Sequence, residues 1–173
     1  RAVVRAAMEG ADAVLHAATL HKPHVGSHDR RAFVDTNITG TLNLLEGAVA
    51  AGASRFVFTS TTSAFGRALT PPPDAPAAWI TEDVAPVPRN VYGATKTAAE
   101  DLLVRLHSEE GLGMTIVRPS HTYDHTSVPF DGGWTVVDRM RRGAEVVVHG
   151  DGTSLWTLTH ATDFARAFVG LLG

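Results

Sequence analysis

The chain has no cysteine among its 173 residues. It therefore forms no disulfide, offers no thiol nucleophile and binds no metal through thiolate ligands. Apolar runs are also short, and none reaches the roughly 20 residues that a membrane-spanning helix needs. The first residues, RAVVRAAMEGADAV, lack the layout of a secretory signal peptide. These absences favour a soluble protein of the cytoplasm.

An excess of positive charge is missing too. Lys and Arg total 15 against 18 Asp and Glu, the net charge is −3, and the basic residues form no cluster. This balance argues against nucleic acid as the main partner. Hydrophobic residues make up 44% and charged residues 19%, which predicts a packed core rather than disorder. The length suits one domain or a large part of one.

What the chain does have is an alternation of helix and strand patterns. Apolar periodicity and stop signals predict helices over 1–10, 31–52, 91–110 and 133–142, and from about His160 onward. Short apolar runs predict strands over 12–18, 54–61, 113–117 and 145–149. The remaining segments include a proline-rich loop over 65–89, a turn over 150–152 and an extended stretch over 154–159. Strands separated by helices predict an α/β fold, with a parallel sheet covered by helices on both faces.

The sequence YGATK places Tyr92 and Lys96 one turn apart on one face of a predicted helix. An ammonium close to a phenol stabilises the phenolate and lowers the tyrosine pKa toward neutrality. Such a tyrosine can exchange a proton with a substrate hydroxyl while a hydride moves to or from a cofactor. The same spacing also occurs by chance in many helices, so the pair alone leaves an ordinary tyrosine and a solvated lysine open.

Other candidate groups have simpler interpretations. His21, His24 and His28 could bind a metal, but a solvated loop is the favoured interpretation because their spacing is interrupted and carboxylate partners are few. His160 and Asp163 are interpreted as a helix cap and a first-turn charge. The sequence does not decide whether Trp134 and Trp156 belong to a core or to a substrate wall.

Six blocks in a fixed order make the chain similar to a known family. They are DAVLHAA, NITGTLNLLEGA, RFVFTSTTSAFG, VYGATKTAAE, MTIVRPSHTY and VVVHGDGTSLWTLTHATDFARA. In this order they resemble the extended short-chain dehydrogenase/reductase family, the NAD-dependent epimerase/dehydratase group that acts largely on nucleotide sugars. The resemblance covers nearly the whole chain and implies a Rossmann-like, doubly wound parallel sheet.

The resemblance also implies roles for individual residues. Tyr92 would be the general acid and base, with Lys96 as its partner and Thr61 as the hydroxyl that orients the substrate. The residues implied to border the cofactor are His16, Ala17, Ala18, Asn37, Thr59, Ser60, Tyr92, Lys96, Pro119 and Ser120. The residues implied to contact the substrate are Thr62, Ser63 and His121.

Two departures from the family pattern shape the prediction. Family dehydratases carry Asp-Glu after the catalytic Thr, whereas this chain has Thr62 and Ser63, which favours epimerase or reductase chemistry. The family's opening strand and glycine-rich turn have no counterpart here, so the resemblance implies an incomplete sheet and an internal fragment. Residues 1–173 would then be a partial NAD(P)-binding domain, with the substrate-binding region beginning at about residue 120.

The resemblance therefore predicts a nucleotide-sugar epimerase that uses NAD or NADP, with NAD preferred, and that forms a homodimer. A carbonyl reductase or dehydrogenase of the same family is one alternative. A non-catalytic binding protein built on the same fold is the other. The resemblance implies that the residues which would discriminate NAD from NADP lie upstream of Arg1.

Overall fold

A computed structural model describes residues 1–130, 132–148, 150, 152 and 155–173. Apart from the last two residues, the chain divides into two compact units, 1–119 and 120–171. Each unit is described by itself below.

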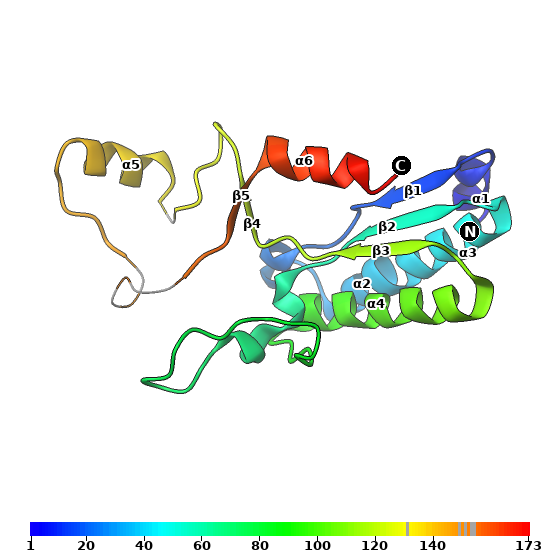
Figure 1. Ribbon diagram of the computed structural model, residues 1–173, viewed down its shortest axis with the longest axis horizontal. Coiled ribbons are helices and arrows are strands. Elements are labelled where there is room, and N and C mark those ends of the chain that lie inside the picture. Colours follow the sequence, from blue (N-terminus) through cyan, green and yellow to red (C-terminus); the bar gives the residue numbers. More distant parts are fainter. Residues whose placement is uncertain (131, 149, 151, 153–154) are drawn as a thin grey trace. The chain divides into compact units, whose positions relative to one another are not determined.

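The first unit is built on a parallel sheet. Its strands are β1 (Ala13–His16), β2 (Arg55–Thr59) and β3 (Met114–Val117), in the order β1-β2-β3 (Figure 1). The register places Phe58 beside His16 on one side and Ile116 on the other. The predicted parallel α/β sheet is confirmed, although β1 is shorter than the predicted strand over 12–18.

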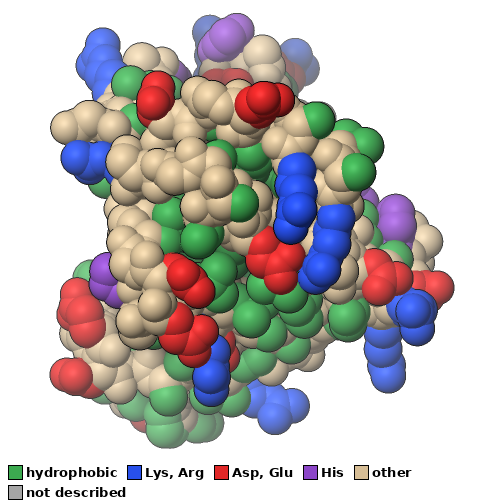
Figure 2. All heavy atoms as spheres, turned by 90° about the vertical axis from the view of Figure 1, so that its right-hand side faces the viewer, with side chains coloured by type: hydrophobic (Ala, Val, Ile, Leu, Met, Phe, Trp, Pro, Cys, Tyr) green, Lys and Arg blue, Asp and Glu red, His purple; other side chains and the backbone are tan. Residues whose placement is uncertain are grey.

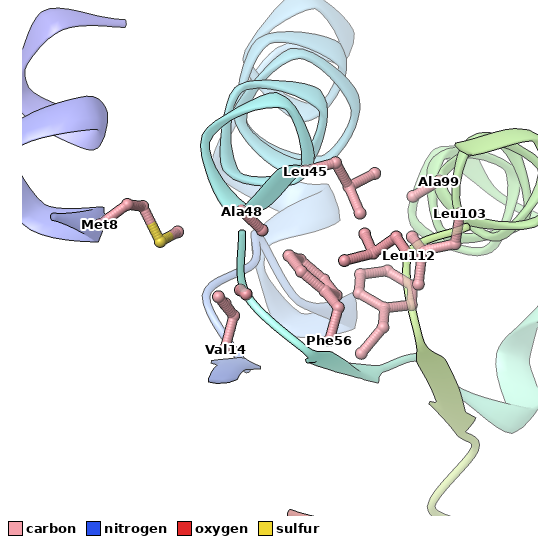
Figure 3. Close-up of a cluster of buried hydrophobic side chains, with 10 residues drawn as sticks. Met8, Val14, Leu45, Ala48, Phe56, Ala99, Leu103 and Leu112 are labelled. Carbon is pink, nitrogen blue, oxygen red and sulfur yellow. The ribbon is translucent and has the colours of Figure 1, made fainter. Parts of the chain in front are cut away.

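Helices of the first unit pack on this sheet. They are α1 (Ala2–Met8), α2 (Arg30–Phe33), α3 (Thr41–Ala51) and α4 (Val91–Glu110). Helices α3 and α4 lie side by side over one face of the sheet, and α1 packs against α3 (Figures 1 and 3). The predicted helix over 31–52 is interrupted by a π-helical turn at Val34–Gly40, and the loop after β1 contains a short 3-10 helix, η1 (Lys22–Gly26).

The hydrophobic core of the first unit lies between the sheet and these helices. Figure 3 shows side chains from α1, α3, α4 and the strands converging on it. The buried members of this cluster are Met8, Val14, Leu45, Ala48, Ala53, Phe56, Phe58, Ala99, Leu103 and Leu112. Burial of the larger side chains in this cluster contributes about 1.5–3 kcal/mol each, so the cluster is what holds α4 against the sheet.

The two ends of the proline-rich loop are hydrogen-bonded to each other. The backbone N–H of Arg67 donates to the Val87 carbonyl at 2.8 Å, and the N–H of Val87 donates to the Phe65 carbonyl at 3.3 Å. Gly66 lies between them at φ +48°, and a Cβ there would stand 2.2 Å from the Val87 carbonyl oxygen. Only glycine fits this crossing, which fixes where the chain after β2 leaves the sheet.

The second unit contains a pair of parallel strands, β4 (His121–Tyr123) and β5 (Leu158–His160). Its helices are α5 (Trp134–Arg141) and α6 (Ala161–Gly170), and α6 packs on both strands. The Nδ1 of His160 accepts a hydrogen bond from the Thr162 N–H at 3.3 Å. This N-cap confirms the structural interpretation of His160.

One strand predicted for this unit is wrong, and one strand that it contains was not predicted. Residues 145–148 form no strand, and His149 lies outside the described residues. Val147 is 95% exposed, so burial of its side chain does not favour a strand here. Strand β4 was not predicted, because three residues give too short a pattern. Trp134 and Trp156, left open by the sequence, are both more than half exposed, at 52% and 55%.

Two properties of the molecule bear on its partners. Within the part of the chain that the structure describes, no helix combines the length and the apolar character needed to cross a bilayer. On the face drawn in Figure 2, acidic and basic side chains are scattered among apolar ones without a field of one sign. This scatter agrees with the net charge of −3.

Candidate functional site

Tyr92 and Lys96 lie in the first two turns of α4, and both are 2% exposed. The helix begins at Asn90, whose side-chain oxygen accepts a hydrogen bond from the Gly93 N–H at 3.0 Å. A Cβ at Gly93 would lie 2.6 Å from the Ser63 carbonyl oxygen. The glycine therefore allows the start of α4 to approach the segment that follows β2, where Thr61 is found.

Thr61 is also buried, and it caps the 3-10 turn Thr62–Ala64 through a hydrogen bond from the Ser63 N–H to its Oγ1 at 3.1 Å. Burial raises the pKa of Tyr92, and hydrogen bonding with the Thr61 side chain opposes that shift without cancelling it. The predicted lowering of the tyrosine pKa toward neutrality is therefore wrong for this structure. The reason is desolvation, because a sequence pattern cannot reveal that the phenol is almost fully covered.

The Lys96 ammonium lies over the Phe58 ring, with Nζ 3.8 Å from the ring centroid. Burial lowers its pKa to about 8, opposed by the charge of Glu100 one turn further along α4. Most Lys96 side chains are therefore still charged at pH 7. A buried cation of this kind is poorly placed for stability but well placed to act on a neighbouring group.

Glu100 is itself buried and is held by Arg118 at the end of β3. The guanidinium donates from Nε to one carboxylate oxygen at 2.9 Å and from Nη2 to the other at 2.6 Å. The Arg118 guanidinium also lies 5.3 Å from the Phe65 ring centroid. This bidentate pair fixes α4 to β3 and leaves Glu100 as the nearby anion for Lys96.

Asn37 links the loop after β1 to α4. It is 1% exposed in the π-helical turn, and its amide oxygen accepts from the Leu20 N–H at 2.8 Å and the Thr19 hydroxyl at 3.0 Å. Its amide nitrogen donates to the Leu20 carbonyl and to the Thr95 hydroxyl, both at 3.0 Å. The π-helical turn thus places one side-chain amide where it hydrogen-bonds both the loop after β1 and α4.

His16, expected beside the cofactor, points its ring into the core. The ring lies 5.4 Å from the Phe58 ring and 6.0 Å from the Phe56 ring, centroid to centroid. Its Nε2 is 2.8 Å from the Thr41 hydroxyl, which donates its own proton to the Asn37 carbonyl, so Nε2–H is the donor toward Thr41. Burial, and then the charge of Lys96, lowers the pKa of His16 to about 4.

This buried imidazole predicts a loss of stability in acid. Between about pH 6.5 and 4 the unfolded chain binds a proton at His16 and the folded chain does not, so the free energy of unfolding falls as pH falls, by about 1 kcal/mol per pH unit. Above pH 6.5 both forms are neutral and the effect disappears. Urea unfolding at several pH values should show a shallower acid loss in His16→Gln than in the wild type or in the exposed control His28→Gln. Equal slopes for all three would contradict the prediction.

Two hydroxyls at the end of β2 lack hydrogen-bond partners among the described residues. They are Thr59 Oγ1 and Ser60 Oγ, and both are buried. Buried hydroxyls are rarely left without a partner, so these two fit a bound polar molecule. Their position at the carboxyl end of a central parallel strand is where such folds hold ligands.

The other predicted site residues are less closely gathered. Thr62 and Ser63 are half-buried beside Thr61, whereas Ala17 and Ala18 are exposed in the loop after β1. Pro119 ends the first unit, and Ser120 and His121 belong to the second. There the ring of His121 packs edge-on against Trp156, with a centroid distance of 4.6 Å.

Sequence reasoning missed four residues that act on members of this site. His21 contacts Tyr92 and the charge of Glu100 acts on Lys96, whereas Thr41 contacts His16 and Arg118 binds Glu100. Glu100 could have been found from the sequence, because it follows Lys96 by four residues and therefore lies on the same helix face. His21, Thr41 and Arg118 come from other elements and are brought there only by the fold. Among the described residues, no three metal-binding side chains gather into a possible metal site.

Comparisons with known proteins fit this geometry. The model of the family described as "NAD dependent epimerase/dehydratase family" matches residues 1–173. The chain is 30% identical to UDP-glucuronate 4-epimerase of Thermodesulfobacterium geofontis, over 92% of this chain and 47% of that protein. It is 29% identical to dTDP-glucose 4,6-dehydratase of Streptomyces griseus, over 94% of this chain and 47% of that protein.

A solved structure extends the likeness to three dimensions. UDP-glucuronic acid 4-epimerase from Bacillus cereus, in complex with UDP-glucuronic acid and NAD, matches with a TM-score of 0.75 at 25% identity. The match covers 98% of this chain and 52% of that one. These similarities confirm the predicted Rossmann-like fold. The chain spans about half the length of the relatives it matches.

Proposed function

Because the chain belongs to the NAD-dependent epimerase/dehydratase family, we propose that it carries the acid–base half of a nucleotide-sugar epimerase. Tyr92 is the group that takes a proton from a sugar hydroxyl and later returns it. The observation that carries this proposal is that Tyr92 is buried and interacts with the Thr61 side chain just after β2, with the buried Lys96 ammonium over the Phe58 ring of the same strand. In Rossmann-like sheets that end of the strands is the ligand side.

The residues present fit the cofactor that the family implies. The two buried hydroxyls without partners, Thr59 Oγ1 and Ser60 Oγ, and the Lys96 ammonium are polar groups that a dinucleotide could satisfy. We propose that these residues, with Asn37 supporting the adjacent loop, hold NAD. When bound, NAD would accept a hydride from a sugar carbon and return it.

The side chains of this protein would manage the proton. The raised pKa of Tyr92 keeps it a neutral phenol in this structure, the form that donates a proton to a carbonyl oxygen. For the reverse transfer the phenolate needs a nearby cation, and Lys96 supplies one below its pKa of about 8. Thr61 would orient the substrate oxygen, since its side chain already interacts with the Tyr92 hydroxyl.

Epimerase chemistry is preferred over dehydratase chemistry because Thr62 and Ser63 follow Thr61. Neither side chain is a carboxylic acid, so neither supplies the acid and base that water elimination needs. We further propose a nucleotide sugar as the substrate, with Thr62, Ser63 and His121 as contacts. Ala17, Ala18, Pro119 and Ser120 would line the cofactor, and the protein would act as a homodimer.

The test is product analysis with the full-length protein, NAD or NADP, and either UDP-glucose or UDP-glucuronic acid. The epimeric sugar should form without accumulation of reduced cofactor, because hydride leaves and returns within one turnover. Stoichiometric reduced cofactor would instead indicate a dehydrogenase. Absence of dinucleotide binding by calorimetry would indicate a binding protein. Calorimetry with both dinucleotides also decides between NAD and NADP.

A further inference from the structure

One histidine outside the predicted site touches the candidate acid and base directly. The ring of His21 lies edge-on against the Tyr92 ring, with 4.9 Å between centroids. Tyr92 is 2% exposed, whereas His21 is an exposed residue. The imidazole therefore stands between the phenol-bearing side chain and solvent.

The backbone on both sides of His21 is anchored. The amide of Asn37 holds the preceding residue, Leu20, at its N–H (2.8 Å) and at its carbonyl (3.0 Å). The N–H of His21 donates to Nδ1 of His24 at 2.8 Å, and the His24 N–H donates back to the His21 carbonyl at 2.8 Å. An exposed ring on a backbone fixed in this way is oriented before any ligand arrives.

The charges around His21 favour its neutral form. Lys22 and His24 face it from its own short helix, and Tyr92 and Lys96 face it from α4. Burial lowers the pKa of His21, and the charges of His24, Lys22 and Lys96 lower it further. A protonated His21 would be a cation close to Lys22 and Lys96. Repulsion between these like charges would push the His21 ring away from Tyr92.

We propose that His21 is a positioning residue for Tyr92: its neutral ring holds the phenol in place and shields it from water. The inference rests on the proposed role of Tyr92. When His21 is protonated, repulsion from Lys22 and Lys96 weakens the ring contact, and the phenol loses its fixed orientation. Displacement of a reacting group by about 1 Å can lower kcat strongly.

Two substitutions separate ring contact from titration. His21→Phe keeps a planar ring against Tyr92, whereas His21→Ala removes it. In the full-length protein with NAD and UDP-glucose or UDP-glucuronic acid, His21→Ala should lower kcat by roughly tenfold or more with little change in KM. His21→Phe should restore kcat to within about twofold of the wild type at pH 7.5. His28→Ala, which removes another exposed ring of the same loop, is the control and should behave as wild type.

The pH profile supplies the second readout. The wild type should lose kcat as pH falls below about 6.5, because the pKa of His21 is lowered from that ordinary value and the ring gains its proton only below it. His21→Phe has no proton to gain at this position and should lose less kcat over the same range. A normal kcat in His21→Ala, or an acid loss in His21→Phe equal to that of the wild type, would overturn the proposal.

A measurement without turnover distinguishes this proposal from the proposed function. With ¹³C-labelled tyrosine rings, the Tyr92 signal is identified as the one lost in Tyr92→Phe. In the wild type it should shift as pH falls below about 6.5, and in His21→Phe it should stay constant over the same range. A Tyr92 signal that ignores this pH range in the wild type refutes the His21 contact. An active Tyr92→Phe variant would refute the catalytic role of Tyr92 but would leave the His21 contact standing.

Discussion

Replacement of Tyr92 by phenylalanine is expected to lower kcat by about two to four orders of magnitude, the usual scale for loss of a general acid and base. The aromatic ring stays, so its contact with His21 is kept. The hydroxyl that Thr61 contacts is lost, and no proton can be exchanged at that point. Steady-state kinetics of the full-length protein with NAD and a UDP-sugar measure the effect.

Two controls make the result interpretable. Urea unfolding of Tyr92→Phe should match the wild type to within about 1 kcal/mol, since only one hydroxyl is removed. Tyr123→Phe removes the hydroxyl of the chain's other tyrosine, which lies in the second unit, and should cost far less turnover. Turnover close to normal in Tyr92→Phe would mean that another residue transfers the proton.

Replacement of Lys96 by methionine is expected to make the protein more stable at pH 7, by up to about 3 kcal/mol, while turnover falls. The ammonium is 2% exposed and its pKa is lowered to about 8 by burial. Keeping it charged in the folded state therefore opposes folding. Methionine fills a similar volume beside Phe58 without a charge.

The pH dependence follows from the direction of the shift. Between about pH 8 and 10.5 the unfolded chain still holds the Lys96 proton and the folded chain has released it, so wild-type stability should rise with pH in this window. Below about pH 8 both forms are charged and this contribution is flat. The Lys96→Met variant lacks the rise, and the difference between the two unfolding curves isolates Lys96.

Lys22 is the matched control, because it is the chain's other lysine and is exposed. Lys22→Met should leave both the stability at pH 7 and its slope above pH 8 unchanged. If Lys96→Met were less stable than the wild type at pH 7, the contact of the ammonium with Phe58 and its attraction to Glu100 would outweigh its desolvation. The proposed conflict between stability and function at this position would then be wrong.

Local patterns determined much of the first unit. Helix α4 spans the predicted residues 91–110, and the structure shows local reasons for both ends: the Asn90 side chain caps its start and Gly111 ends it in a left-handed conformation. The parallel sheet also follows from short apolar strands separated by helices. The ordered blocks of the resemblance identified the family and the Tyr92–Lys96 pair, since four residues of helix place both side chains on one face.

Tertiary structure decided what those side chains experience. The sequence predicts a lowered pKa for Tyr92, but burial raises it, and desolvation depends on atoms brought from β2, the loop after β1 and α4 together. His21 reaches Tyr92 across a long sequence separation, and Arg118 reaches Glu100 from the end of another strand. The predicted strand over 145–149 fails for the same reason. A strand, unlike a helix, takes its hydrogen bonds from a neighbour that the local sequence does not contain.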